Sequence, residues 1–168
     1  MIFNEVTKGQ LNAIQNNIDN IQTTSRAPLN TAGWYRVAEY KGVNTNASLG
    51  DRANSCYLTI KQANSAKGNE SHRLLLGSIK NSQYITSVFS KSISGQRAIT
   101  KARHTREGLY CYLEVYYALD VNNVVMFSVD MAEDHNSTWK AITPTLTEET
   151  VSGVTVTTTY DIPANASP

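Results

Sequence analysis

The sequence has few cysteines, little charge and no long apolar run, and each shortage excludes a class of protein. Two cysteines in 168 residues are too few for a scaffold held by disulfides. Charged residues make up 17% of the chain and the net charge is +1, so the excess of Lys and Arg that a general nucleic-acid binder needs is missing. No apolar run approaches the roughly 20 residues of a transmembrane helix, and the first residues (MIFNEVTKGQ) lack a secretory signal. We therefore expect no nucleic-acid partner and no membrane insertion.

Motifs of the common enzyme classes are also missing. The sequence has no GxSxG nucleophile elbow, no Walker or dinucleotide fingerprint, and no two histidines at a metal-binding spacing. Residues 130–135 hold three carboxylates and His135, but they lack the EF-hand spacing, so we interpret them as a solvated loop. Cys56 and Cys111 lie in apolar alternating runs typical of buried, inert thiols, although a bridge between them stays open. We expect no catalytic residue, no metal and no cofactor, and hence no enzyme.

Neutral polar residues take the place of the missing charge. The chain contains 16 Asn, 15 Ser and 18 Thr, while 40% of its residues are hydrophobic, which is enough to build one core. The length fits one globular domain with a short appendage. This composition suits a stable extracellular or virion surface.

The N-terminal region predicts a short coiled-coil helix over residues 4–25. Leu11, Ile14, Ile18 and Ile21 follow a heptad spacing, while the other faces carry Asn, Gln and Asp. So narrow an apolar stripe is typical of a coiled-coil seam, and Leu or Ile at these positions favours three or four strands over two. A single helix folded back on the domain is the alternative. We therefore expect a trimeric coiled coil in residues 1–27 and a head domain in residues 28–168.

After Pro28 the pattern changes to short runs rich in Val, Ile, Thr and Tyr, separated by Gly, Asn, Ser or Asp. Such runs predict strands, and the absence of any alternation with helices argues against a parallel α/β fold. The number and spacing of the runs predict a mainly β fold, an antiparallel β-sandwich of the jelly-roll kind. The expected strands are residues 34–40, 57–62, 73–79, 85–90, 99–104, 109–119, 124–131, 139–142 and 154–160.

Two turn signals indicate how three of these runs are connected. Gly108 follows Glu107 and is free to take positive φ, as a tight hairpin requires. Asn122 and Asn123 tolerate the left-handed region, so they predict a second hairpin. We therefore expect an antiparallel meander over residues 99–131.

A stripe of tyrosines marks the outer face of the central run. Alternation places Cys111, Leu113, Val115 and Tyr117 on one side, and Tyr110, Tyr112, Glu114 and Tyr116 on the other. Exposed aromatic rings are common in the centre of subunit interfaces, and they also stack on the apolar faces of sugars. We predict a trimer interface at Tyr110, Tyr112 and Tyr116, with cross-strand packing and ligand stacking as alternatives.

Two stretches of the sequence resemble a known family. Residues 28–40 (PLNTAGWYRVAEY) are similar to a recurring opening of the tail-fibre and receptor-binding proteins of tailed bacteriophages and prophages, in which a short trimeric coil leads into a strand with a Gly-Trp-Tyr-Arg stretch. Residues 99–103 (ITKAR) and 109–117 (LYCYLEVYY) resemble the central hairpin of such heads. The resemblance spans most of the chain, but the family has no fixed binding residues to transfer.

The resemblance implies a homotrimeric head at the tip of a phage or prophage tail, located on the virion, in contact with other tail proteins and attached to a bacterial surface polysaccharide or protein receptor. In such a head the distal loops carry recognition, so the expected receptor contacts are Arg52, Asn54, Asp134, His135 and Trp139. The alternatives are a structural β-sandwich of the virion without a ligand and a carbohydrate-active enzyme domain.

Overall fold

The structure is a computed structural model and describes residues 7–12, 22–41, 54–64, 68–79, 82–93, 97–133, 139–149 and 152–167. Within these ranges the chain is almost entirely β-strand. The strands are β1 (Gln22–Leu29), β2 (Gly33–Lys41), β3 (Asn54–Asn64), β4 (Gly68–Ile79), β5 (Ser82–Ser92), β6 (Ile99–Glu107), β7 (Tyr110–Tyr117), β8 (Asn123–Glu133), β9 (Lys140–Thr147), β10 (Thr155–Asp161) and β11 (Asn165–Ala166). No helix in these ranges is long and apolar enough to cross a membrane.

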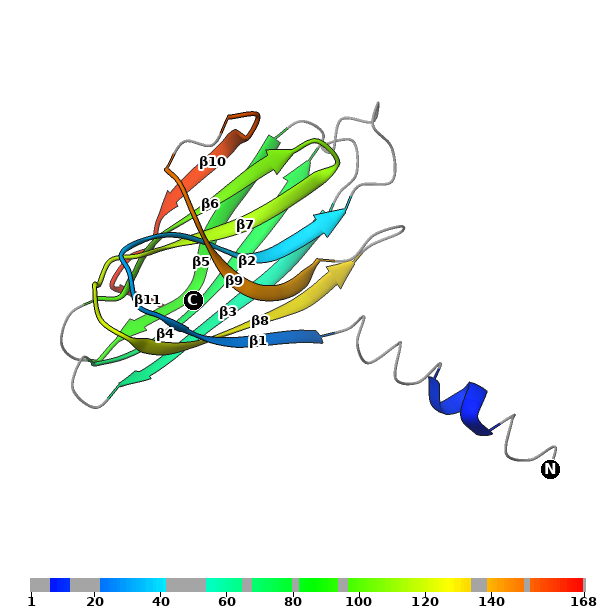
Figure 1. The fold of residues 1–168 in the computed structure, drawn as a ribbon, viewed down its shortest axis with the longest axis horizontal. Helices are drawn as coiled ribbons and strands as arrows, with labels where there is room; N and C mark the ends of the chain where they lie inside the picture. The colour runs from blue at the N-terminus through cyan, green and yellow to red at the C-terminus, as the bar shows by residue number, and fades with distance from the viewer. Residues whose placement is uncertain are drawn as a thin grey trace.

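The strands form two antiparallel sheets that pack face to face (Figure 1). The six-stranded sheet has the order β1-β8-β3-β4-β5-β11, and the five-stranded sheet has the order β10-β6-β7-β2-β9. The chain passes repeatedly from one sheet to the other, while β3, β4 and β5 follow one another within the six-stranded sheet. The predicted β-sandwich is confirmed.

The hydrophobic core lies between the sheets and takes side chains from both. Leu58 of β3 and Phe127 of β8 face it from the six-stranded sheet, and Leu113, Val115 and Tyr117 of β7 face it from the five-stranded sheet. All five side chains are fully buried. Burying side chains of this size stabilises the fold by about 1.5–3 kcal/mol each. The alternation predicted for β7 is therefore confirmed.

The hairpin at Gly108 is confirmed, but the meander over residues 99–131 is wrong. β6 pairs with β7, and Gly108 between them has a φ of 59°. β7 does not pair with β8, because the chain crosses to the other sheet after Tyr117. Asn123 is buried there and donates to the Tyr117 hydroxyl, which itself donates to the carbonyl of Val121. These bonds hold an arch between the sheets in place of a flat hairpin.

The helix predicted over residues 4–25 is wrong at its C-terminal end, where β1 begins at Gln22. β1 pairs with β8 at the edge of the six-stranded sheet. The β-branched side chain of Thr24 favours a strand, and an edge strand tolerates Pro28 because its missing N–H can face away from the sheet.

The described N-terminal helix covers residues 7–12, and Figure 1 draws it away from the two sheets. Leu11, the first residue of the predicted seam, is 60% exposed. The other seam residues, Ile14, Ile18 and Ile21, lie outside the described residues. The coiled coil is thus not supported beyond this short helix, and the division into a coil and a head stays a prediction.

Candidate functional site

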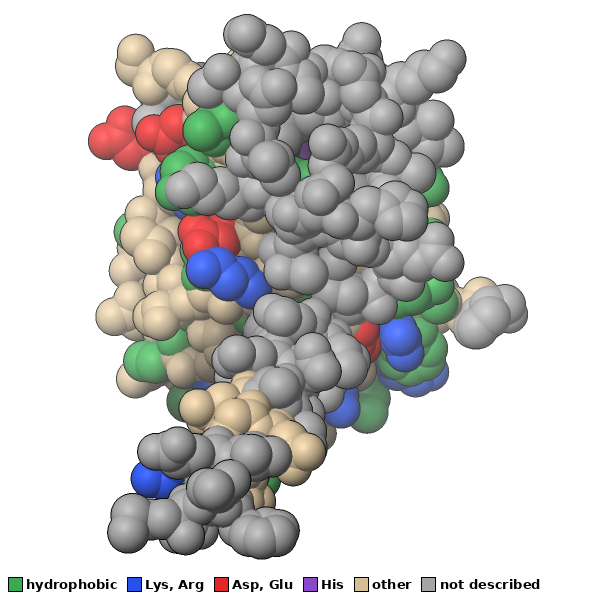
Figure 2. Space-filling model, turned by 90° about the vertical axis from the view of Figure 1, so that its right-hand side faces the viewer, with side chains coloured by type: hydrophobic (Ala, Val, Ile, Leu, Met, Phe, Trp, Pro, Cys, Tyr) green, Lys and Arg blue, Asp and Glu red, His purple; other side chains and the backbone are tan. Residues whose placement is uncertain are grey.

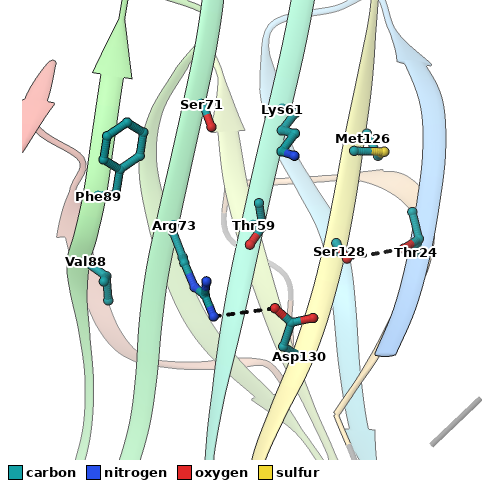
Figure 3. A pocket seen from close by; sticks show the side chains of 10 residues that line it. All are labelled: Thr24, Thr59, Lys61, Ser71, Arg73, Val88, Phe89, Met126, Ser128 and Asp130. Carbon is teal, nitrogen blue, oxygen red and sulfur yellow. Dashed lines mark hydrogen bonds and ion pairs between the residues drawn. The ribbon is translucent and has the colours of Figure 1, made fainter. Parts of the chain in front are cut away.

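The outer face of the six-stranded sheet carries a groove built from polar side chains. Strand register brings Ser128 of β8, Thr59 of β3, Arg73 of β4 and Phe89 of β5 into one row across the sheet. The adjacent row, in which Met126, Lys61 and Ser71 are register partners, continues the floor. The groove has a volume of about 650 Å³ (Figure 3) and is lined by Thr24, Thr59, Lys61, Ser71, Arg73, Val88, Phe89, Met126, Ser128 and Asp130.

Arg73 is the best-anchored cation of this groove. Figure 3 shows its side chain reaching across β3 toward Asp130, and its Nη2 lies 3.6 Å from Asp130 Oδ2. Its guanidinium also lies 4.5 Å from the centre of the Tyr57 ring. These contacts hold the guanidinium over the sheet, while 45% of the side chain remains exposed to a ligand. On the far side, the hydroxyls of Thr24 and Ser128 are bonded to each other at 3.2 Å.

This face of the molecule is basic. A second groove of about 390 Å³ shares Lys61 with the first and adds Arg26, and a third of about 420 Å³ extends past Phe89 to Lys91. Of the described side chains that alternate outward from this sheet, the only carboxylate is that of Asp130, with which Arg73 pairs, while the buried Glu70 borders the second groove. The local excess of positive charge favours ligands that carry negative charge together with hydroxyls. Composition did not predict this, because the net charge of +1 averages over both sheets.

The surface at the end of the sandwich differs from this basic face. In the end-on view of Figure 2, described hydrophobic side chains form small separate patches, and a basic and an acidic side chain lie side by side.

Among the residues predicted as receptor contacts, Trp139 is described and does not line this groove. Trp139 is only 3% exposed, with its ring 5.6 Å from the Tyr40 ring and 5.9 Å from the His104 ring. Two rings thus enclose Trp139 in the core, and the structure does not support its predicted role as a receptor contact. Asn54 begins β3, but its side chain is not among those described. Arg52, Asp134 and His135 lie outside the described residues, and their role stays a prediction.

The tyrosine stripe packs against its own sheet. Tyr110 stacks on Tyr112 at 6.1 Å, and the Arg36 guanidinium lies 3.9 Å from the centre of the Tyr112 ring. Tyr116 packs edge-on against Trp34 at 5.4 Å. All three tyrosines are half-buried within one chain. Cross-strand packing thus accounts for much of the stripe, and its role as a trimer interface stays a prediction.

Beneath these rings lies a buried ion cluster centred on Glu114. Arg36 Nε donates to Glu114 Oε1 at 3.0 Å, and Arg103 Nε donates to Oε2 at 2.6 Å. Thr105 donates to Oε1 at 3.1 Å, and the other nitrogens of Arg103 bond the carbonyls of residues 148–149. Because Glu114 is 1% exposed and accepts from two guanidinium groups, it is not placed to donate a proton to a substrate. We assign this cluster a structural role.

A second buried cluster contains the residue types of a serine hydrolase but not their arrangement. His72 Nδ1 lies 2.7 Å from Ser90 Oγ, and His72 Nε2 lies 3.2 Å from Glu70 Oε2. Ser90 donates its one proton to the carbonyl of Pro163, so it accepts from His72 and is not activated as a nucleophile. All three side chains are buried. Sequence reasoning missed this cluster because Glu70 and His72 lie on β4, whereas Ser90 comes from β5.

The cysteines take no part in either cluster. Cys56 and Cys111 are both free and buried. The prediction of buried thiols is therefore confirmed, and the two cysteines form no disulfide with each other. Burial raises the pKa of the Cys111 thiol to about 11 and that of Cys56 further. Among the described residues, no group of three His, Cys, Asp or Glu side chains is placed to hold a metal ion.

His104 predicts a loss of stability in mild acid. Burial, with a smaller effect from Arg106, lowers the pKa of His104 to about 4 from its ordinary value near 6.5. Between these two values the unfolded chain binds a proton that the folded chain does not, so stability falls as the pH falls. We expect about 2 kcal/mol of this loss between pH 7 and pH 5, measured by urea unfolding. His104→Gln should remove that part of the pH dependence. If the free energy of unfolding changed equally with pH in the variant and the wild type, the effect would not come from His104.

Comparison with known proteins gives two similar solved structures. No family model and no curated protein matches the sequence. The tailspike protein of Acinetobacter phage vB_ApiP_P1 is similar with a TM-score of 0.42 and 14% identity, over 71% of this chain and 22% of the tailspike chain. A tailspike protein of the Acinetobacter baumannii bacteriophage Fri1, described as a capsular polysaccharide depolymerase, has a TM-score of 0.37 and 12% identity, over 73% of this chain and 20% of that chain.

Both similar structures are phage tailspikes, the kind of phage tail protein that the sequence resemblance indicates. The chain spans about a fifth of the length of each. The expectation that the chain is not an enzyme is contradicted, because the Fri1 tailspike is described as a depolymerase. The missing catalytic motifs do not exclude that class, since the two carboxylates of a glycosidase are paired by the fold and need no fixed sequence spacing.

Proposed function

We propose that this chain is the receptor-binding β-sandwich of a phage or prophage tail protein, and that the outer face of its six-stranded sheet binds a bacterial surface polysaccharide. The groove between Arg73 and Phe89 is the observation that carries this proposal. It combines a fixed but exposed guanidinium, several hydroxyls and one aromatic ring, which together match the acidic groups, hydroxyls and apolar faces of sugars.

The lining favours a polysaccharide over a protein receptor. The centre of a protein interface is poor in Lys and Asp, whereas this groove contains Lys61 and Asp130. The basic character of the face favours polysaccharides that contain uronic acids or other acidic sugars. We also propose that the chain acts as a homotrimer, as the N-terminal seam predicts. Three copies on one tail would offset the weak binding of each single groove.

The first test compares Arg73→Ala with the wild-type chain. Surface polysaccharide extracts from a panel of bacterial strains are immobilised, and binding of the purified chain is measured. We expect at least one acidic extract to bind. Arg73→Ala should weaken that binding about 10- to 100-fold, because hydrogen bonds to charged groups contribute about 1.5–3 kcal/mol. Release of reducing ends is measured in the same samples, so that cleavage of the polysaccharide is detected alongside binding.

Lys101→Ala is the matched control for this experiment. Lys101 is exposed on β6 of the five-stranded sheet, so the variant removes the same charge from the opposite side of the sandwich. Its binding should equal that of the wild type. Failure of every extract to bind the wild-type chain, or equal losses in both variants, would overturn the proposed function.

A further inference from the structure

Tyr84 lies across Gly77 on the outer face of the six-stranded sheet. The two residues are register partners on β5 and β4. A Cβ atom at Gly77 would lie 2.0 Å from Cζ of Tyr84 and 2.2 Å from its hydroxyl oxygen. The phenol end of Tyr84 therefore fills the space that any other side chain at position 77 would need. Gly77 is buried for this reason, although it lies on the outward side of its strand.

The Tyr84 ring is also unusually open for a residue seated on a sheet. Its side toward β4 rests on the backbone of Gly77, while 43% of the residue is exposed to solvent. Phe89, on the same strand and face, is 37% exposed. Both exposed aromatic rings thus lie on the face that carries the groove.

Register places this ring in line with the groove. Arg73, Leu75 and Gly77 alternate outward along β4, so the Tyr84–Gly77 pair lies four residues, about 13 Å, from the Arg73–Phe89 row. The row between them holds Leu75 and Tyr57, and the Tyr57 ring lies under the Arg73 guanidinium. A polysaccharide that lies along β4 from the groove meets the Tyr84 ring after this intervening row.

We propose that Tyr84 is a stacking platform for a sugar ring, and that Gly77 is required because it lets the phenol lie over the strand. The C–H face of a pyranose packs on the open face of the ring, and the hydroxyl at the ring edge bonds sugar hydroxyls. This inference rests on the proposed function, since it extends the same polysaccharide beyond the groove. A second copy of the chain stacked on this face is the competing occupant.

Three variants test the platform with the polysaccharide extract that binds the wild-type chain. Tyr84→Ala should lower the affinity about 3- to 10-fold, the range expected for one aromatic stacking contact. Tyr84→Phe keeps the ring and should stay within about twofold of the wild type. Gly77→Ala should lower the affinity as Tyr84→Ala does, although the aromatic ring is still present, because its Cβ displaces the phenol.

Leu146→Ala is the control, because Leu146 is another exposed apolar side chain that contacts a glycine, on β9 of the five-stranded sheet. It is 49% exposed and lies over Gly33, where a Cβ would be 2.8 Å from Leu146 Cδ1. Its loss should leave binding unchanged. Tyr84→Trp gives a direct readout of binding, because the native Trp34 and Trp139 are both buried. The new, exposed indole should shift its fluorescence emission to the blue when the polysaccharide extract binds.

The outcomes separate the platform from the proposed function. If Arg73→Ala weakens binding while Tyr84→Ala and Gly77→Ala bind like the wild type, the platform is wrong and the groove stands. If no extract binds the wild-type chain, the proposed function and the platform both fail. If light scattering gives a lower mass for Tyr84→Ala than for the wild type, while polysaccharide binding is unchanged, the Tyr84 ring makes a contact between copies of the chain. That result would overturn the proposed platform.

Discussion

Glu114→Gln should destabilise the protein by about 3–5 kcal/mol, the cost of removing one partner from a buried ion cluster. Both carboxylate oxygens accept from guanidinium groups, those of Arg36 and Arg103. An amide at this position turns its own N–H₂ toward one of those donors and leaves two cations under the aromatic rings. The free energy of unfolding in urea measures the loss. The tyrosine stripe should open as well, because Tyr112 packs on Arg36 and Trp34 packs on Arg103.

Glu107→Gln is the matched control for this variant. Glu107 also pairs with Arg36, at 3.0 Å, but its side chain is 48% exposed. Exposed pairs contribute about 0–1 kcal/mol, so the control should be nearly as stable as the wild type. Equal losses for Glu114→Gln and Glu107→Gln would contradict the assignment of Glu114 as the centre of the cluster.

Glu70→Ala should be of similar severity. The Glu70 carboxylate accepts from the backbone N–H groups of Ala98 at 2.5 Å and Ile99 at 3.1 Å, and it also contacts His72. Its removal leaves these buried donors without an acceptor, at about 1–3 kcal/mol each. We expect a total loss of about 3 kcal/mol or more in urea unfolding, with faster amide hydrogen exchange at Ala98 and Ile99.

Gln62→Met provides the contrast. Gln62 is the register partner of Glu70 and is buried, but neither atom of its side-chain amide has a hydrogen-bond partner among the described residues. Replacing such an amide by an apolar side chain of similar length should be neutral or stabilising. If Glu70→Ala were as mild as Gln62→Met, the carboxylate would not anchor the strand that begins at Ile99.

Local patterns predicted most of the strands. Each of the nine predicted runs lies in or overlaps an observed strand, because the alternation of apolar and polar residues records which face is buried. β1 was missed because its residues continue the polar side of the apparent heptad. The short β11 was missed because two residues carry no period. The link after Tyr117 was misplaced because alternation gives the face of a strand but not its partner.

The candidate site was not predictable by the same means. Thr24, Arg73 and Asp130 are far apart in the sequence and share a face only through the register of β1, β8, β3 and β4. Trp139 was predicted as a receptor contact, but its place in the sequence does not show that its ring turns into the core. The long-range pairings that decide both points leave no signal in a single sequence.

The account depends most on polysaccharide binding at the outer face of the six-stranded sheet. The direct measurement is a titration of the ¹⁵N-labelled chain with fragments of the acidic extract that binds it, following backbone amide shifts. We expect the largest shifts at Thr59, Ser71, Arg73 and Ser128, with Thr145 and Thr157 of the other sheet unchanged. Shifts confined to the five-stranded sheet would contradict the account.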